Sequence, residues 1–231
     1  MSTNHEDEEA PIEPLLEIIF NKCCELAMES ILGCVLQMYV YLAYPNEADS
    51  FALVSILISS ITTGYTSAMI AFDNDVDTEG RKGQPRFYGY IPDDNGLRGR
   101  CFTLMTLIGM LHNLSRSVGC ALLAVTDKNL LFAFVGGEIL LYLLYKLARG
   151  DILFWARVEG VAGVIVSIFY RVIVKVIADF SGCIHWRHPL ELGGLAFTMS
   201  MLWAQIFPFV ALIFFKDNDK KEALTIFLAS R

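Results

Sequence analysis

The sequence predicts an all-α membrane protein, a polytopic bundle of about six transmembrane helices with both termini in the cytosol. Hydrophobic residues make up 55% of the 231 residues, and the mean hydropathy is +0.48. Soluble domains contain about 45–50% apolar residues by a similar count. The excess lies in long apolar blocks, and most Lys and Arg residues lie at the ends of these blocks or between them. These features predict a multi-pass integral protein of the plasma membrane or an endomembrane.

Six apolar blocks are each close to the roughly 20 residues that a helix needs to cross a bilayer core. The first block ends at Pro45, which has no backbone N–H with which to continue a helix. The sixth begins after Pro189 and ends near Phe215. The first five expected helices cover residues 15–44, 51–72, 101–125, 130–147 and 158–180.

One transmembrane domain, residues 15–215, is expected between two short tails. The acidic tail over residues 1–14 is expected to be disordered. It begins MSTNHEDEEA, without the basic segment that opens a secretory signal, so the first apolar helix is expected to direct membrane insertion. A cytosolic loop is expected over residues 73–98, and residues 216–231 are expected to form a short amphipathic cytosolic tail.

The distribution of Lys and Arg predicts the orientation. If the N-terminus is cytosolic, most of the 18 Lys and Arg residues lie on the cytosolic side. Outside the spans, only Lys128 and Arg187 fall on the other side. This asymmetry follows the positive-inside rule. Since it places both termini in the cytosol, the number of spans must be even, and six satisfies this.

Polar and ionisable residues inside the apolar blocks are the main candidates for function. A charge at a helix centre costs about 2.5–3.5 kcal/mol on insertion scales, so these side chains are expected to face the bundle interior or water and to pair with one another. In the first and fifth blocks they recur every fourth residue, which places them on one helical face. The candidate path residues are Glu25, Glu29, Gln37, Arg116, Glu138, Arg171, Lys175 and Asp179.

The expected topology also predicts the depth of these charges, at about 1.5 Å per residue. Glu25 is expected near the inner face and Glu29 about a third of the way across. The midplane is expected to hold Arg116, Glu138 and Arg171, with Lys175 and Asp179 approaching the outer face. If they share one face of the bundle, they form a polar ladder across the membrane. The alternative is a set of buried ion pairs that fix helix packing.

Other candidate sites are weaker. The loop from Asp73 begins like an EF-hand, but Thr78 and Gln84 stand where Gly and the bidentate Glu are required, so a calcium loop of that type is rejected. His185, His188 and Glu191 are suitable metal ligands by type, and whether they bind metal is left open. No cofactor is expected. Cys23 and Cys24 lie where palmitoylation occurs in other proteins, although apolar packing is the preferred interpretation.

Two resemblances bear on function. Residues 26–39, LAMESILGCVLQMY, match a Glu-Ser-x-Pro-Gln-x-x-Leu-Gln pattern at Glu29, Ser30, Leu36 and Gln37 but not at Leu32 and Gly33, and a Ser-rich helix follows. This region resembles the XK-related family, which includes phospholipid scramblases. The resemblance implies cytosolic termini and charges that step across the membrane.

The second resemblance covers most of the chain. It is carried by segments such as Thr62-Thr63-Gly64-Tyr65, the residues FYGYIPD at 87–93, and Arg187-His188-Pro189. In these segments the chain resembles uncharacterised multi-pass proteins of algae and related protists. That resemblance implies no activity.

The sequence therefore predicts a membrane transport protein, scramblase-like or channel-like, and not an enzyme. It would move lipid headgroups or ions along an intramembrane charged path. The alternative is a non-catalytic structural subunit of a larger membrane complex. The expected partners are membrane lipids, together with other membrane subunits or further copies of the chain. Nucleic-acid binding is excluded because the net charge is −7 and the basic residues form no stripe.

Overall fold

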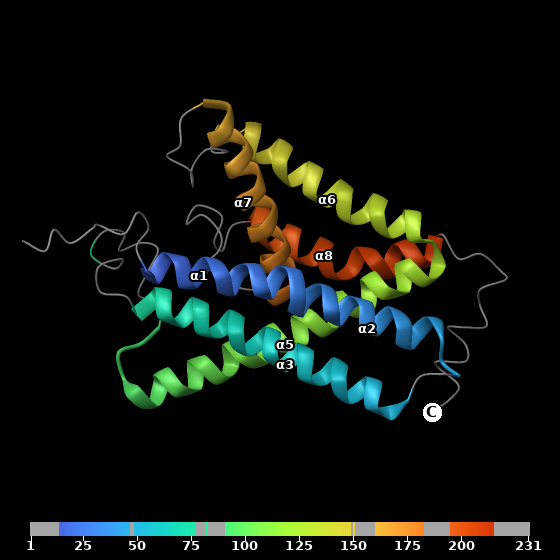
Figure 1. Cartoon of the computed structure of the whole chain (residues 1–231), viewed down its shortest axis with the longest axis horizontal. Coiled ribbons are helices and arrows are strands. Elements are labelled where there is room, and N and C mark those ends of the chain that lie inside the picture. The colour runs from blue at the N-terminus through green and yellow to red at the C-terminus, as the bar shows by residue number, and fades with distance from the viewer. Residues whose placement is uncertain are drawn as a thin grey trace, which may run out of the picture.

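The computed structural model describes residues 14–46, 49–76, 82, 91–148, 150, 160–182 and 195–214. Nearly all of these residues are helical, and they form a bundle in which α5 is the central helix (Figure 1). Five helical segments are long and apolar enough to cross a membrane, and α8 (Leu195–Phe214) is a further apolar helix of 20 residues. The prediction of an all-helical, multi-pass arrangement is confirmed at this level.

The first predicted helix is continuous but not uniform. It consists of α1 (Pro14–Glu25), a π-helical turn η1 (Leu26–Ile31) and α2 (Leu32–Ala43), and it ends beside Pro45. A π turn widens the helix locally and shifts the face on which the following side chains lie. The sequence predicted one helix here without this turn.

The polar connection at residues 73–98 is shorter than expected, because helix extends into it from both ends. α3 covers Ser50–Val76, and α5 covers Asn95–Thr126. Asp94 begins α5 as its N-cap, since its carboxylate accepts a hydrogen bond from the Leu97 N–H at 2.9 Å. Asp75, which is buried near the end of α3, accepts one from the Ile91 N–H at 2.7 Å.

α3 and α5 approach each other closely where glycines face each other. A Cβ on Gly64 would overlap the Thr106 carbonyl oxygen and lie 2.6 Å from the Met110 backbone nitrogen. A Cβ on Gly109 would lie 3.0 Å from the Gly64 Cα. Small residues allow such backbone contact between membrane helices, where dispersion replaces the hydrophobic effect as the main attraction.

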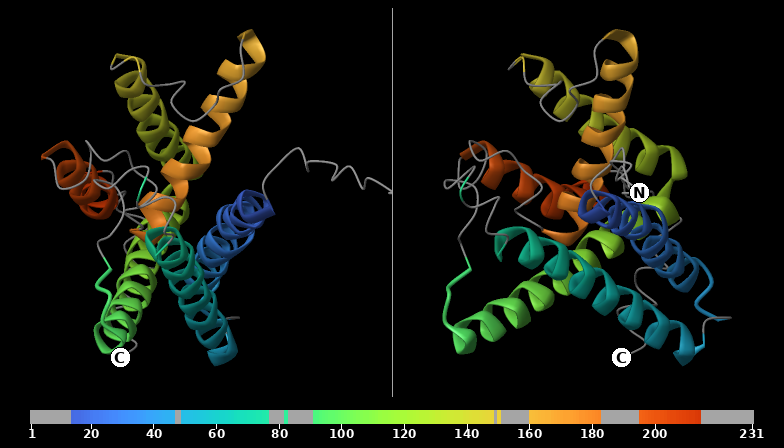
Figure 2. Two further views of the ribbon diagram at one scale, coloured as in Figure 1. Left: turned by 90° about the vertical axis from the view of Figure 1, so that its left-hand side faces the viewer. Right: turned by 60° about the vertical axis from the view of Figure 1, so that its left-hand side comes forward.

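α5 turns directly into α6 (Lys128–Ala148) through Asp127, whose carboxylate accepts the Asn129 N–H at 2.9 Å. The two helices form an antiparallel hairpin that packs Leu123 against Phe134. Beyond this contact α6 leaves the bundle, and α7 (Gly160–Ser181) returns towards it from the same side (Figure 2). Figure 2 shows α6 and α7 diverging away from the other helices.

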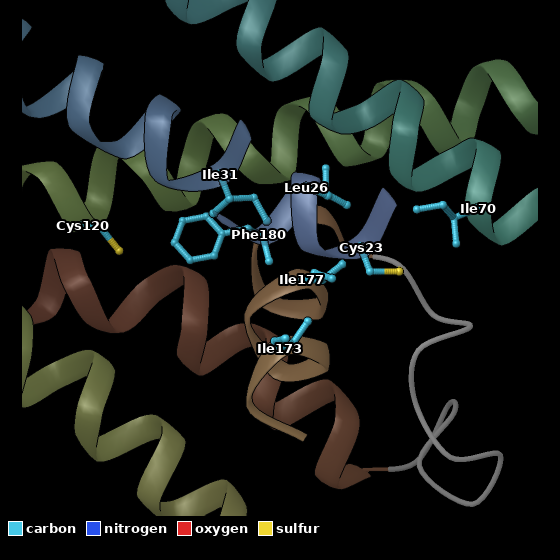
Figure 3. Packing of buried hydrophobic residues seen from close by; sticks show 9 residues of the cluster. Cys23, Leu26, Ile31, Ile70, Cys120, Ile173, Ile177 and Phe180 are labelled. Atoms are coloured by element: carbon cyan, nitrogen blue, oxygen red, sulfur yellow. The ribbon is translucent and has the colours of Figure 1, made fainter. Parts of the chain in front are cut away.

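The end of α7 packs into the middle of the bundle. Its residues Ile173, Ile177 and Phe180 join an apolar cluster with Leu26 and Ile31 of η1 (Figure 3). The cluster also contains Cys23, Ala27, Ile70 and Cys120, and Cys24 packs against it. Cys23 and Cys24 are thus packing residues, as the preferred interpretation predicted.

The depth predicted for the end of α7 is wrong. Ser181 lies against Gly109, and Gly182 lies 3.5 Å from the His112 ring, measured from the position of a Cβ. Both contacts are near the middle of α5. Asp179 is therefore level with the central part of α5 and does not approach its outer end, because α7 crosses the bundle obliquely instead of running alongside α5.

α8 runs in the same direction as α5. The Gln205 Nε2 atom lies 2.9 Å from the His112 Nε2 atom. Pro208, one turn later in α8, lies beside Gly119, two turns later in α5. In six simply alternating passes the third and sixth spans would run in opposite directions, so the observed path is more complicated than that expectation.

Candidate functional site

The polar seam is a line of polar residues along two facing helices. In α6 the members follow one another every fourth residue, and the same spacing holds in α7, so each set occupies one helical face. All but Tyr142 are buried, and Tyr142 is half-buried. The seam comprises Glu138, Tyr142 and Lys146 of α6 and Ser167, Arg171, Lys175 and Asp179 of α7.

One end of the seam is joined to α5 by Arg116. Its guanidinium forms a buried ion pair with Glu138 and donates a second hydrogen bond to the Ala204 carbonyl oxygen of α8. The guanidinium carbon lies 4.8 Å from the centre of the Phe134 ring and 5.6 Å from that of Phe180. Arg116 therefore connects four helices through hydrogen bonds and cation–π contacts.

The charges of α7 continue from this pair. Lys175 and Asp179 form a buried ion pair one turn apart. Both act electrostatically on Glu138, so the two ion pairs are neighbours. The Lys175 ammonium lies 5.9 Å from the centre of the Tyr142 ring, and the Lys146 ammonium lies 5.8 Å from the same ring. Tyr142 is thus bordered by two cations and connects successive turns of the seam.

Three atoms of this group have no hydrogen-bond partner. They are the Glu138 Oε1 atom, the Arg116 Nε atom and the Ser167 hydroxyl, and all three are buried. Such atoms are costly to leave unsatisfied, and in native proteins they mark the place of a water, an ion or a ligand. The group therefore offers both a hydrogen-bond acceptor and hydrogen-bond donors to a polar guest.

The eight predicted path residues separate into two groups. Arg116, Glu138, Arg171, Lys175 and Asp179 are all buried, and contacts or electrostatic interactions join every one of them except Arg171, whose place is given by its position on the α7 face.

The other predicted residues lie elsewhere. Glu25 and Glu29 are exposed, whereas their neighbours Leu26 and Ala27 face the core. Gln37 is half-buried and accepts a hydrogen bond from the Ser59 hydroxyl at 3.3 Å. The described structure therefore does not bring Glu25, Glu29 and Gln37 to the seam.

A second polar group lies among α2, α3 and α5. The Asn113 amide donates to the Ser60 hydroxyl at 3.5 Å, and the Cys34 sulfur is 3.4 Å from the same hydroxyl. Ser117 donates to the Asn113 side-chain oxygen at 3.4 Å. All of these partners are neutral and satisfied by one another, so this group is explained by helix packing.

The remaining candidate sites receive no support as metal centres. Among the described residues, no group of three or more His, Cys, Asp and Glu side chains lies together. The predicted His185, His188 and Glu191 group is outside the described residues, as are the tails at 1–13 and 215–231.

Sequence reasoning missed two members of the seam. Lys146 was assigned to the cytosolic end of its helix, and Tyr142 was not considered polar. Starting from Glu138 and stepping by four residues, as was done in the first and fifth helices, reaches both of them. That spacing was the available signal.

No protein-family model, curated protein or solved structure matches this chain.

Proposed function

We propose that this protein is a membrane transport protein, scramblase-like or channel-like, in which lipid headgroups or ions move along the polar seam. The observation that carries the proposal is the continuous line of buried polar side chains on the facing sides of α6 and α7. Ionisable residues within membrane helices are costly, and functional use is their usual explanation.

The surroundings of the seam suit a guest that is polar at one end. On their outer sides the two helices expose only apolar groups near the seam, including Leu140, Leu144, Ile165 and Phe169. A phosphate could interact with Arg171 and Lys175, and an amine with Glu138, while acyl chains stay against the apolar sides. A zwitterionic headgroup therefore fits the mixed charges better than a simple ion does.

We infer that the N-terminus and the connection between α3 and α5 lie in the cytosol, because the Lys and Arg residues of the connection follow the positive-inside rule. A cytosolic C-terminus, with six spans, stays a prediction, and the direction of α8 argues against it. Labelling of single added cysteines in sealed vesicles would decide the side of each terminus.

The test is lipid scrambling in liposomes that contain the purified protein. A fluorescent lipid is bleached from outside by an impermeant reductant, and ion leak is recorded in parallel. We expect bleaching beyond the outer leaflet's half of the label. Replacing Lys175→Gln together with Asp179→Asn removes two opposite charges from one helix, and we expect it to slow transfer about tenfold, the effect of raising the barrier by about 1.4 kcal/mol.

The matched control is Glu29→Gln, which removes a charge of the same kind from a face remote from the seam. It is expected to leave the rate unchanged. If wild-type protein moves neither lipids nor ions, or if the double variant scrambles at the wild-type rate, transport along the seam is excluded. The charges would then be packing pairs, as in a structural subunit.

A further inference from the structure

The outward face of the first helix carries charge where the rest of its surface is apolar. Glu25, Met28, Glu29, Leu32 and Leu36 are all exposed. They follow one another at spacings of one, three or four residues, so they lie on one side of the helix. We call this set the acidic face. Met28 is 66% exposed and Leu36 is 62% exposed, which is the character of a lipid-facing surface.

Glu29 lies well inside the apolar segment that crosses the membrane. This segment runs from Asn21 to Ala43, and Glu29 is eight residues from its beginning, which is about 12 Å. Glu25 is closer to the end, where a carboxylate can reach water. A carboxylate at the depth of Glu29 cannot remain charged against lipid without a high cost.

Nothing in the adjacent helices covers this carboxylate. The inward side of the same turn, Leu26, Ala27 and Ile31, packs against α7 and α3, so Glu29 is directed away from the bundle. The turn itself is the π-helical segment η1, an irregularity that is frequent at functional sites.

The acidic face also has room for a second helix. Gly33 follows Glu29 by one turn, and a Cβ added to it would meet no atom within 4 Å. A small residue on an exposed membrane helix lets another backbone approach closely. Charge and space together therefore specify the missing neighbour: a helix that supplies a positive charge.

We propose that the acidic face binds a transmembrane helix of another protein that carries a Lys or Arg at the depth of Glu29. The partner's cation pairs with the Glu29 carboxylate inside the membrane, and its backbone packs over Gly33. This interaction is independent of the seam, because the two sites face different directions.

The experiment measures energy transfer in liposomes between the full chain, labelled at an added terminal tag, and a synthetic transmembrane helix. The probe is a Leu/Ala helix with a single Lys placed at the depth of Glu29, and the control probe has Leu at that position. We expect the Lys helix to associate about five- to thirtyfold more tightly than the Leu helix, the range for a strong interhelical polar contact.

Protein variants then locate the contact. Glu29→Gln is expected to abolish the preference for the Lys helix, whereas Glu25→Gln, nearer the membrane surface, should reduce it slightly. Leu140→Gln, which adds the same amide to the exposed side of α6, should leave it intact.

Two results would overturn the proposal. One is equal association of the Lys and Leu helices with the wild-type chain. The other is energy transfer between two differently labelled copies of the chain that Glu29→Gln removes, which would assign the acidic face to self-association. Lipid transfer measured on the same vesicles keeps this result separate from the transport test, since Glu29→Gln should not alter it.

Discussion

The central helix α5 is held by two interfaces of opposite kinds. Against α3 it makes backbone contact at Gly64 and Gly109, without charged groups. Against α6 it is joined by the ion pair of Arg116 and Glu138. The first interface cannot accept an added atom, and the second cannot lose a charged partner. Apolar contact is sufficient to hold helices together here, so the costly charges of the second interface call for a separate explanation, which transport provides.

The largest expected effect comes from breaking the charged interface on one side. Glu138→Leu leaves Arg116 buried without its carboxylate, and we expect the free energy of unfolding to fall by about 3–5 kcal/mol. Unfolding in mixed detergent micelles, followed by Trp fluorescence, measures this loss.

The matched control replaces both partners. Since two well-packed apolar residues often substitute for a buried ion pair without loss, Arg116→Leu with Glu138→Leu should recover most of the stability. The same double variant should remain inactive in lipid transfer. Stability near that of the wild type in the single variant would show that the pair does not join α5 to α6.

The next effect breaks the apolar interface. Gly64→Ala places a methyl group against two backbone atoms of α5, which cannot move away as a flexible side chain could. We expect a loss of about 1–3 kcal/mol, the usual cost of overpacking. In Gly136→Ala the new Cβ meets nothing within 4 Å, so the higher helix propensity of Ala should be neutral or raise stability by up to about 1 kcal/mol. Equal losses in both variants would contradict this interpretation of the α3–α5 contact.

The boundaries of the helices were largely predictable, because each depends on local chemistry. Every described span begins and ends within a few residues of its predicted limits, except that α5 begins at Asn95 rather than at Cys101. The N-cap Asp94 explains that difference, and the signal was present in the sequence. The π turn at Leu26–Ile31 was not predictable, since no residue pattern specifies it.

The arrangement of the helices was less predictable than their limits. A depth estimate assumes that each helix runs parallel to its neighbours, and α7 crosses obliquely instead. For the same reason Glu29 and Glu138 could not be separated by sequence: both are acids in apolar helices, and only the packing of Leu26 and Ile31 against α7 shows that Glu29 faces outward. The polar periodicity of α6 was readable and would have identified Lys146.

A smaller effect is expected where α5 meets α8. Gly119→Ala would bring a Cβ within 2.9 Å of the Pro208 Cβ. The obstacle here is a side chain and not backbone, so α8 can shift by a few tenths of an ångström. We expect a loss of about 1 kcal/mol, at the lower end for overpacking, in the same unfolding assay. A loss as large as that of Gly64→Ala would mean that α8 is fixed as rigidly as α3.

The smallest effect concerns a neutral hydrogen bond outside both interfaces. Gln37→Leu removes the acceptor of the Ser59 hydroxyl, between α2 and α3. Interhelical hydrogen bonds in membranes contribute about 0.6 kcal/mol on average, because the separated helices find other partners, and we expect a loss of this size. A double-mutant cycle with Ser59→Ala isolates the pair. A coupling energy near that of Arg116 with Glu138 would show that charge is not what distinguishes the seam, and the contrast between the two interfaces of α5 would lose its functional meaning.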